Sequence, residues 1–406
     1  MEWDKLPLTV LKFGGSSVAD SARMRHVAQI VKKTREEGYR VAVVVSAMGN
    51  TTDDLLALAS DVASEADGRE MDQLLATGEQ QSVALLALAL KQFGLPAQSF
   101  TAQQAGIRAK GFPMEGRIYR IEPDAVEKVL NEGTVAVITG FQAITDNGDV
   151  ITLGRGGSDT TAVALAAELH ADVCEIYTDV DGVYTADPRI VPNARKMEEV
   201  TYDEMLEMAS LGAKVLHSRC VEIAKKYGVE LLVCSSLNRN SGTMVREKTK
   251  MEKMLISGVA ADKNVAKIRV AGLGNDPEST FRLLNLLDRN NLNIDVMIQS
   301  LGKDGTKSVS FTVAKPDMLR TIDVLNDNKD SLGIKKLDYD ENVAKISVIG
   351  AGVRSHSGVA AKMFGALANA GINTEMITTS EIRITALIDE AYADQAMRAI
   401  HETFLE

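Results

Sequence analysis

The chain has 406 residues, 45% of them apolar and 25% charged, with 45 basic against 56 acidic residues and a net charge of -11. At roughly 150 residues per domain this length predicts two to three domains, which excludes a small disulfide scaffold, and the composition excludes wholesale disorder. The acidic balance, with no long basic run, makes nucleic acid and anionic membranes poor candidate partners.

Targeting and metal signals are also missing. The longest uninterrupted apolar stretch, Val83 to Leu90, is far shorter than the roughly 20 residues that a membrane-spanning helix needs. The first residues, Met-Glu-Trp-Asp-Lys, are acidic where a signal peptide would be basic. The cysteines and histidines lack metal-ligand spacing, and the former are expected to be reduced packing residues: Cys174, Cys220 and Cys234. We therefore predict a cytoplasmic protein without a membrane partner or a protein-held metal.

The first part of the chain alternates β-branched runs with helical patterns. In chain order, the pattern predicts a strand at 9–13, a helix at 21–36, a strand at 41–45, helices at 52–64 and 71–93, strands at 135–138 and 173–177, and helices at 159–169 and 202–209. Such alternation is typical of an α/β layer fold with a largely parallel sheet.

The end of the chain repeats itself. Residues 237–253 are polar and weakly periodic, which predicts a domain boundary. Beyond it, Lys267–Gly274 matches Lys345–Gly352, and Asn293–Asp295 matches Asn373–Glu375, at an offset of 78 to 80 residues. Each copy has the pattern strand, glycine turn, amphipathic helix and strand. We expect a tandem of small α+β modules that serves regulation or oligomerisation.

Three loops carry candidate chemistry. In Lys12–Ser17 (Lys-Phe-Gly-Gly-Ser-Ser), adjacent glycines before a helix let backbone N–H groups approach a phosphate, and Lys12 adds a full charge. In Leu153–Thr161 an arginine within a glycine turn can hold a carboxylate, and Ser158 and Asp159 are expected to cap the next helix. Residues 177–189 gather three acids, two tyrosines and an arginine in a turn-rich loop. An ordinary capped turn remains the alternative for the first two.

Six motifs in order identify the family. They are Lys12–Ser17, the Val-Ser-Ala-Met-Gly-x-Thr-Thr of 45–52, the Ala-Thr-Gly-Glu of 76–79, the Gly-Arg-Gly-Gly-Ser-Asp-Thr of 154–160, the Tyr-Thr-Asp-Val-Asp-Gly-Val-Tyr of 177–184 and the Gly-Ala-Lys-Val-Leu-His of 212–217. Together they resemble the aspartokinases, which have the amino-acid-kinase fold, and the repeated modules resemble that family's paired ACT domains. The resemblance covers nearly the whole chain.

The resemblance implies roles for individual residues. Lys12 and Lys214 would neutralise the transferring phosphoryl group, and Asp159 would orient their ammonium groups. The expected ATP-binding residues are Lys12, Gly14, Gly15, Ser16, Thr178, Asp179, Asp181, Tyr184, Arg189 and Lys214. The expected aspartate-binding residues are Ser46, Thr52, Glu79, Arg155, Gly156 and Ser158, with Arg155 on the α-carboxylate and Glu79 on the α-ammonium group. ATP is then the co-substrate, and Mg²⁺ would be held mainly by its phosphates, so no protein ligand is expected.

The same resemblance implies domains and regulation. We expect an amino-acid kinase domain at 1–240, aspartate-binding to residue 150 and ATP-binding from 151, and a linker at 241–256. Ferredoxin-like ACT domains would follow at 257–337 and 338–406, with an exchange of strands between them as an option. Lysine or threonine, or both, would bind near Asn275, Asp276, Asn293, Asp295, Gln299, Asn373, Thr374, Ser380 and Glu381. A homo-oligomer through the ACT domains is expected. A shorter ACT-only subunit could start at Met251 or Met254.

The expected activity is transfer of the ATP γ-phosphoryl group to the β-carboxylate of L-aspartate, the first step toward lysine, threonine and methionine. One alternative is a kinase for another amino acid, such as glutamate or acetylglutamate. Another is an inactive ACT amino-acid sensor, which we would expect to lack the two lysines and Asp159 that this chain has.

Overall fold

The computed structural model describes the chain apart from residues 1–2, 65–66, 212–214, 238–240, 249–255, 303–304 and 406. The described residues form two units. The first lies within Met1–Val183, Lys196–Ser210 and Lys214–Glu252, and the second within Tyr184–Arg195, Leu211–Ala213 and Lys253–Glu406. The segment Tyr184–Arg195 therefore packs in the second unit, although it falls inside the 1–240 range expected for the kinase domain.

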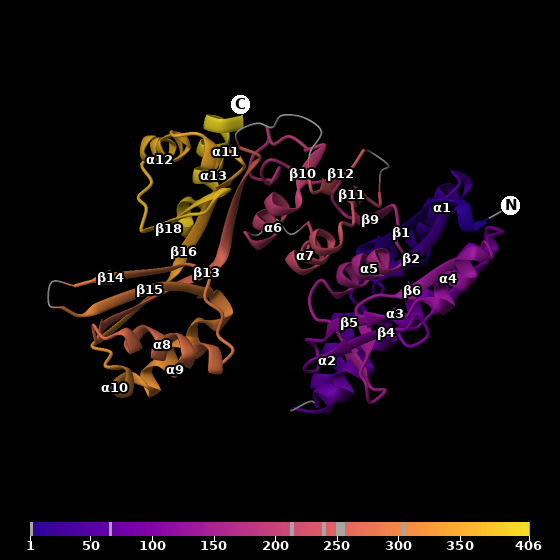
Figure 1. Ribbon diagram of the computed structural model, residues 1–406, viewed down its shortest axis with the longest axis horizontal. Helices are drawn as coiled ribbons and strands as arrows, with labels where there is room; N and C mark the ends of the chain where they lie inside the picture. Colours follow the sequence, from indigo (N-terminus) through magenta and orange to yellow (C-terminus); the bar gives the residue numbers. More distant parts are fainter. Residues whose placement is uncertain are drawn as a thin grey trace. The chain divides into compact units, whose positions relative to one another are not determined.

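The first unit is built on an eight-stranded sheet (Figure 1). Its strands, in spatial order, are β10 (Glu199–Thr201), β12 (Thr243–Arg246), β11 (Leu231–Ser235), β9 (Val173–Thr178), β1 (Leu8–Phe13), β2 (Arg40–Val45), β6 (Val135–Thr139) and β3 (Ala97–Phe100). Every neighbouring pair is parallel except β11 and β12. The mainly parallel α/β sheet predicted from the β-branched runs is confirmed.

Helices cover both faces of this sheet. They are α1 (Ser21–Glu36), α2 (Thr51–Val62), α3 (Gly68–Gln92), α4 (Asp124–Asn131), α5 (Gly157–Glu168), α6 (Tyr202–Ser210) and α7 (Ser218–Tyr227), with short 3-10 turns η1 (Trp3–Lys5) and η2 (Gly15–Val18). Leu11 and Phe13 of β1 join a buried core with α1 and α3. Because side chains alternate along a strand, Lys12 points to the other face, where α5 lies against β1. A small second sheet has the order β5 (Arg117–Ile121), β4 (Ile107–Lys110), β7 (Gln142–Ile144) and β8 (Val150–Thr152).

The second unit is built on a six-stranded antiparallel sheet (Figure 1). Its order is β14 (Met297–Leu301), β15 (Lys307–Ala314), β13 (Gly258–Leu273), β16 (Lys336–Ile349), β18 (Arg383–Asp389) and β17 (Met376–Thr379). The helices are α8 (Pro277–Arg289), α9 (Met318–Asp327), α10 (Lys329–Leu332), α11 (Gly352–Ser355), α12 (Val359–Asn369) and α13 (Ala393–Leu405), with η3 (Lys315–Asp317) and η4 (Glu390–Tyr392). The order of the strands is symmetric about the central pair β13 and β16.

Each repeat of this unit has its own large hydrophobic core among the described residues. Ile268 of β13 and Phe311 of β15 belong to the first core, and Ile346 of β16 and Met363 of α12 belong to the second. The central strands serve both cores: Val259 of β13 lies in the second, and Leu337 of β16 packs against the first. The two repeats therefore share their longest strands and form one continuous sheet.

Candidate active site

The candidate site lies where the parallel strands of the first unit end. The chain leaves β1 and returns as β2 on one side, whereas β9 pairs with β1 on the other side. Ligands of open parallel sheets bind at the carboxyl ends of the strands, at the point where the strand order reverses. Of the predicted site residues, those that follow β1, β2 and β9 are brought together at this edge.

The first turn needs glycine because two backbones approach closely. The N–H of Gly49 donates to the carbonyl of Gly15 at 3.0 Å, and a Cβ on Gly15 would lie 2.8 Å from the carbonyl oxygen of Ala47. Ser46 is attached to the same turn, since its N–H donates to the carbonyl of Phe13 at 3.1 Å. The glycine turn after β1 and the turn after β2 therefore form one surface. Asp20 caps the helix that follows, α1, because its side chain accepts the N–H groups of Ala22 and Arg23.

Lys12 and Asp159 form an ion pair at the base of this turn. Lys12 Nζ lies 2.5 Å from Asp159 Oδ1, and the two side chains are only 11% and 14% exposed. A Cβ on Gly14 would lie 3.5 Å from Nζ, which places the ammonium group directly beside the glycine turn. The structure thus brings together two of the three predicted catalytic residues. The third, Lys214, lies outside the described residues.

Glu79 is a buried carboxylate beside the turn after β2. Its Oε1 accepts the N–H of Ala47 at 2.9 Å, while Oε2 has no hydrogen-bond partner in the described part of the chain. Only 2% of the residue is exposed, and this burial raises the pKa of the Glu79 carboxyl to about 7. Gly78 permits the close approach, because a Cβ there would lie 2.8 Å from the Cβ of Ala47. Glu79 can therefore offer a free carboxylate oxygen to a cationic ligand.

The second glycine turn precedes α5. Gly154 and Gly156 have φ angles of 74° and 68°, the left-handed region that favours glycine. Gly156 is the N-cap of α5 and no side-chain cap is found there among the described residues, so the expectation that Ser158 and Asp159 cap this helix is wrong. Both lie in its first turn instead, where Asp159 is paired with Lys12. Arg155 is exposed at the tip of the turn.

His217 lies against this turn as a helix cap. Its Nδ1 accepts the N–H of Arg219 at 3.4 Å, at the start of α7. A Cβ on Gly156 would lie 2.4 Å from the Cβ and Cγ of His217. The contact fixes the helix start against the turn and accounts for glycine at position 156.

The predicted ATP loop is divided between the units. Thr178 ends β9 and donates from Oγ1 to Asp179 Oδ1 at 3.0 Å, and Asp181 lies 3.6 Å from the ammonium nitrogen of Lys196. These residues belong to the first unit, whereas Tyr184 and Arg189 belong to the second. Arg189 forms an ion pair with Asp187 at 2.6 Å, and its side chain is 86% exposed. Thr178, Asp179 and Asp181 therefore lie in the unit that holds the strand ends, and the other two lie in the second unit.

Two residues that support the second glycine turn were not predicted from the sequence. Arg219 of α7 donates to the carbonyls of Leu153 at 2.9 Å and Gly116 at 2.7 Å, and burial lowers the pKa of its guanidinium. Asp72 of α3 is buried and accepts the hydroxyl of Thr152 at 2.6 Å. Both residues hold the segment that leads into the second glycine turn. They bond mainly to backbone or to a single hydroxyl, which leaves no pattern in the sequence.

The predicted effector residues fall into two corresponding groups in the second unit. In the first repeat, Gln299 Oε1 accepts the hydroxyl of Thr280 at 2.7 Å, which joins β14 to the start of α8 after Asn275 and Asp276. In the second repeat, the turn between β17 and β18 contains Ser380 and Glu381, and Glu381 pairs with Arg354 of α11 at 3.0 Å. The segments that precede the edge strands supply the rest: Asn293 and Asp295 before β14, and Asn373 and Thr374 before β17.

Three further observations concern metal ligands, thiols and membrane-spanning helices. Among the described residues, no group of three or more His, Cys, Asp or Glu side chains could hold a metal ion. Cys174, Cys220 and Cys234 are buried thiols that take part in no disulfide. Within the same residues, no helix is long and apolar enough to cross a bilayer.

Comparisons with known proteins agree with this geometry. The model of the amino acid kinase family matches residues 7–235, and an ACT domain model matches residues 346–404. The first unit is thus an ATP-dependent kinase unit, and the second is of the ACT class.

Similarities over the full length of the chain are to aspartokinases. The chain is 48% identical over 405 residues to the aspartokinase of Mycolicibacterium smegmatis, covering 98% of this chain and 96% of that protein. Two crystal structures of E. coli aspartokinase III, each 28% identical, cover 98% of this chain and 100% of theirs. One, with aspartate and ADP in the R-state, has a TM-score of 0.82, and the other, with lysine and aspartate in the T-state, has 0.77. The chain therefore belongs to the aspartokinase family.

Proposed function

We propose that the chain transfers the γ-phosphoryl group of ATP to the β-carboxylate of L-aspartate, giving 4-phospho-L-aspartate for lysine, threonine and methionine synthesis. The observation that carries the proposal is the Lys12 and Asp159 ion pair, buried beside the glycine turn at the end of β1. The aspartate and ADP bound to E. coli aspartokinase III support the same pair of ligands.

The phosphate end of the site acts by electrostatics. Phosphoryl transfer depends mostly on positioning and on neutralising charge at the equatorial oxygens. Lys12 supplies a fixed cation whose direction Asp159 sets, and Lys214 supplies the second. The N–H groups of Gly14, Gly15 and Ser16 would donate to the phosphates. Mg²⁺ would neutralise the ATP phosphates and be held mainly by their oxygens and by water, as is usual for this hard cation.

The amino-acid end of the site would recognise the α-ammonium and α-carboxylate groups of aspartate. The unpaired Oε2 of Glu79 would accept the α-ammonium group, and the Arg155 guanidinium would hold the α-carboxylate as a fork. Polar groups that complete this pocket would be Ser46, Thr52, Gly156 and Ser158. The β-carboxylate then faces ATP, and with an ordinary pKa near 3.9 it needs no general base at neutral pH.

The nucleotide would lie across the end of β9. Thr178, Asp179 and Asp181 would contact its sugar or base, and the resemblance adds Tyr184 and Arg189.

Regulation would act through the ACT repeats. We propose that lysine or threonine, or both, bind at the two corresponding groups of effector residues, which the lysine complex of E. coli aspartokinase III supports. The chain would form a homo-oligomer through its ACT sheet in the cytoplasm. A shorter regulatory subunit could start at Met251 or Met254, both outside the described residues.

One assay tests the reaction and its rivals. ATP and hydroxylamine are supplied with L-aspartate, L-glutamate or N-acetyl-L-glutamate, and the trapped hydroxamate is measured with and without lysine and threonine. We expect hydroxamate with aspartate alone, at a rate that lysine or threonine reduces. Product with glutamate or acetylglutamate would favour another amino-acid kinase. No product with any of them would favour an inactive sensor.

A further inference from the structure

The internal sequence repeat also includes a segment that precedes the glycine turns. Asp262–Ile268 reads Asp-Lys-Asn-Val-Ala-Lys-Ile and Asp340–Ile346 reads Asp-Glu-Asn-Val-Ala-Lys-Ile, so six of seven positions are identical. The first copy lies in β13 and the second in β16, the two central strands. Each begins with the same turn: Asp262 accepts the N–H of Asn264 at 2.8 Å, and Asp340 that of Asn342 at 2.9 Å. Lys267 and Lys345 are therefore equivalent residues in equivalent local structures.

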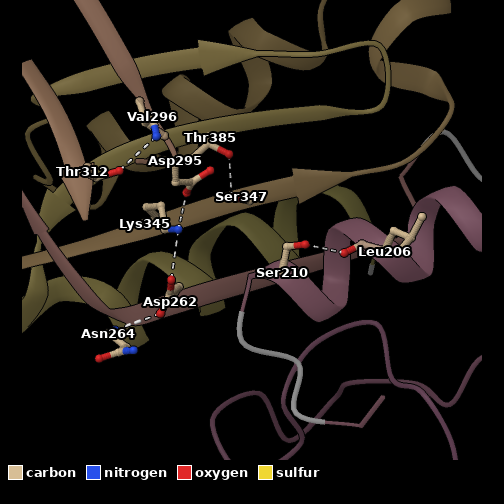
Figure 2. Close-up of polar contacts among 10 residues, drawn as sticks. All are labelled: Leu206, Ser210, Asp262, Asn264, Asp295, Val296, Thr312, Lys345, Ser347 and Thr385. Carbon is tan, nitrogen blue, oxygen red and sulfur yellow. Dashed lines mark hydrogen bonds and ion pairs between the residues drawn. The ribbon is translucent and has the colours of Figure 1, made fainter. Parts of the chain in front are cut away.

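Each of these lysines pairs with an acid of the other repeat. Lys345 Nζ lies 2.5 Å from Asp295 Oδ2 and 3.0 Å from Asp262 Oδ2, and Figure 2 shows it between the two carboxylates. Lys267 forms an ion pair with Glu375. Asp295 and Glu375 are themselves equivalent, each two residues after the asparagine of the Asn-Ile-Asp and Asn-Thr-Glu motifs. The two ion pairs are thus reciprocal and cross from one repeat to the other.

The acids stand at the entry to the edge strands. The N–H of Asp295 donates to the carbonyl of Thr312 at 3.1 Å, and that of Val296 donates to Thr312 Oγ1 at 3.1 Å (Figure 2). The N–H of Glu375 donates to the carbonyl of Leu387 at 2.8 Å. We name residues 293–297 the first entry segment and 373–377 the second. Both contain predicted effector residues, so each lysine holds a segment that a ligand would contact.

A shared apolar cluster makes this arrangement stiff. Val265, Val296, Val343, Met376 and Leu387 form one buried cluster. Val265 and Val343 are equivalent positions of the repeated heptapeptide, and Val296 and Met376 directly follow the two acids. The side chain of Lys345 is only 6% exposed, so water has little access to replace its carboxylate partners. The side chain of Lys267 is 25% exposed, so water has more access to its ion pair.

We propose that Lys345 and Lys267 are positioning residues that hold the two entry segments crosswise, each from the central strand of the opposite repeat, and so couple the two effector sites. The coupling of the two effector sites rests on the proposed effector binding. The crosswise hold, by which each lysine pairs with the acid of the opposite entry segment, does not depend on it. A ligand that moves Asp295 must move Lys345 in β16, and one that moves Glu375 must move Lys267 in β13. The first segment is held more firmly, because Lys345 is more deeply buried and also bonds Asp262.

Hydrogen exchange of the full chain tests the crosswise hold without any ligand. We expect K345M to speed amide exchange in the first entry segment at least tenfold and to leave the second within twofold. K267M should do the reverse, with a smaller change, and K345R and K267R should restore protection because they keep the charge. The matched control is K315M, which removes the ion pair of Lys315 with Glu390, also between repeats, at 2.8 Å. Loosening of both segments by either variant, or of neither, would overturn the proposal.

Inhibition of the full-length enzyme by lysine and threonine tests the coupling. Without effector, K345M and K267M should retain turnover within twofold. We expect K345M to raise the half-inhibitory concentration of each effector and to abolish any mutual enhancement between them, which K315M retains. Unchanged effector curves in K345M would overturn the coupling. If neither amino acid inhibits the unmodified enzyme, the proposed feedback fails instead, and the exchange experiment still decides the crosswise hold.

Discussion

Each unit buries a lysine beside carboxylates, and the two lysines are compensated differently. Among the described residues, Lys12 pairs with one carboxylate, Asp159, at the open carboxyl end of a parallel strand. Lys345 pairs with two carboxylates, Asp262 and Asp295, in the central strand of an antiparallel sheet. A lysine ammonium group has three N–H donors, so Lys12 keeps donors for an incoming anion at the strand end. Lys345 divides its donors between two carboxylates within the sheet, and it serves to join chain segments.

Removal of the first lysine should give the largest effect on activity. K12M should lower kcat about 10³-fold, because loss of one charge donor to a transferring phosphoryl group costs this much in comparable sites. The KM for aspartate should change little, since Lys12 faces the phosphates. Hydroxamate formation under saturating substrates measures both constants.

The control for this variant is K32M, on the exposed surface of α1 beside Glu36. It should retain full activity and the same circular dichroism spectrum. If K12M retained kcat within tenfold, Lys12 would resemble Lys345 in function and the contrast between the two lysines would fail.

Replacement of Glu79 should affect substrate binding, whereas replacement of Lys12 should affect turnover. E79Q should raise the KM for aspartate up to about 100-fold, because the α-ammonium group would lose a charged partner in a buried site. The kcat should fall much less. Glutamine keeps the shape and can still accept the N–H of Ala47, so a folding defect is not expected.

The pH dependence follows from the raised pKa of Glu79. Below about pH 7 the free enzyme increasingly holds a neutral Glu79, which cannot pair with the ammonium group. The value of kcat/KM for aspartate should therefore fall about tenfold per pH unit below 7 and level off above it. The same profile for E79Q should be flat in this range. An inflection that persisted in E79Q would assign the titration to another group.

The second lysine should affect stability rather than chemistry. K345M leaves Asp262 and Asp295 without their cation, and we expect the opening free energy of β13 and β16 to fall by about 2 kcal/mol, less than for a fully buried pair because Asp295 is 46% exposed. K315M should cost less than about 1 kcal/mol, as the side chains of its pair are 31% and 32% exposed. Hydrogen exchange under mild denaturant measures both. Equal losses would mean that burial does not distinguish these pairs.

The smallest effect is expected at the cysteines. Burial raises the pKa of the Cys174 and Cys220 thiols, so little reactive thiolate exists near neutral pH. A thiol-reactive dye should label none of the three cysteines in the native protein, which should keep its activity during the treatment. In urea the dye should label all three. Rapid native labelling would show that the core around α5 and α7 opens readily.

Much of the first unit could be predicted because its signals are local. The run of β-branched residues at 41–45 and the apolar spacing at 21–36 specify their elements through neighbours in the chain. The small sheet β5-β4-β7-β8 was missed, because its strands have three to five residues and lack a clear alternation. The cap of α5 was wrong, since Gly156 adopts a left-handed φ and Asp159 turns to Lys12 instead.

The sequence by itself determined the layer fold, the glycine turns and the family, because these depend on periodicity and on short motifs. Only the tertiary structure decided which charges meet. Asp295 and Lys345 are 50 residues apart, and Arg219 reaches Leu153 across 66. It also placed Tyr184–Arg195 with the ACT repeats, where Ala186 and Val191 join their core. Contacts of this kind depend on long-range packing, because burial sets how strongly two charges interact. No local sequence pattern predicts them.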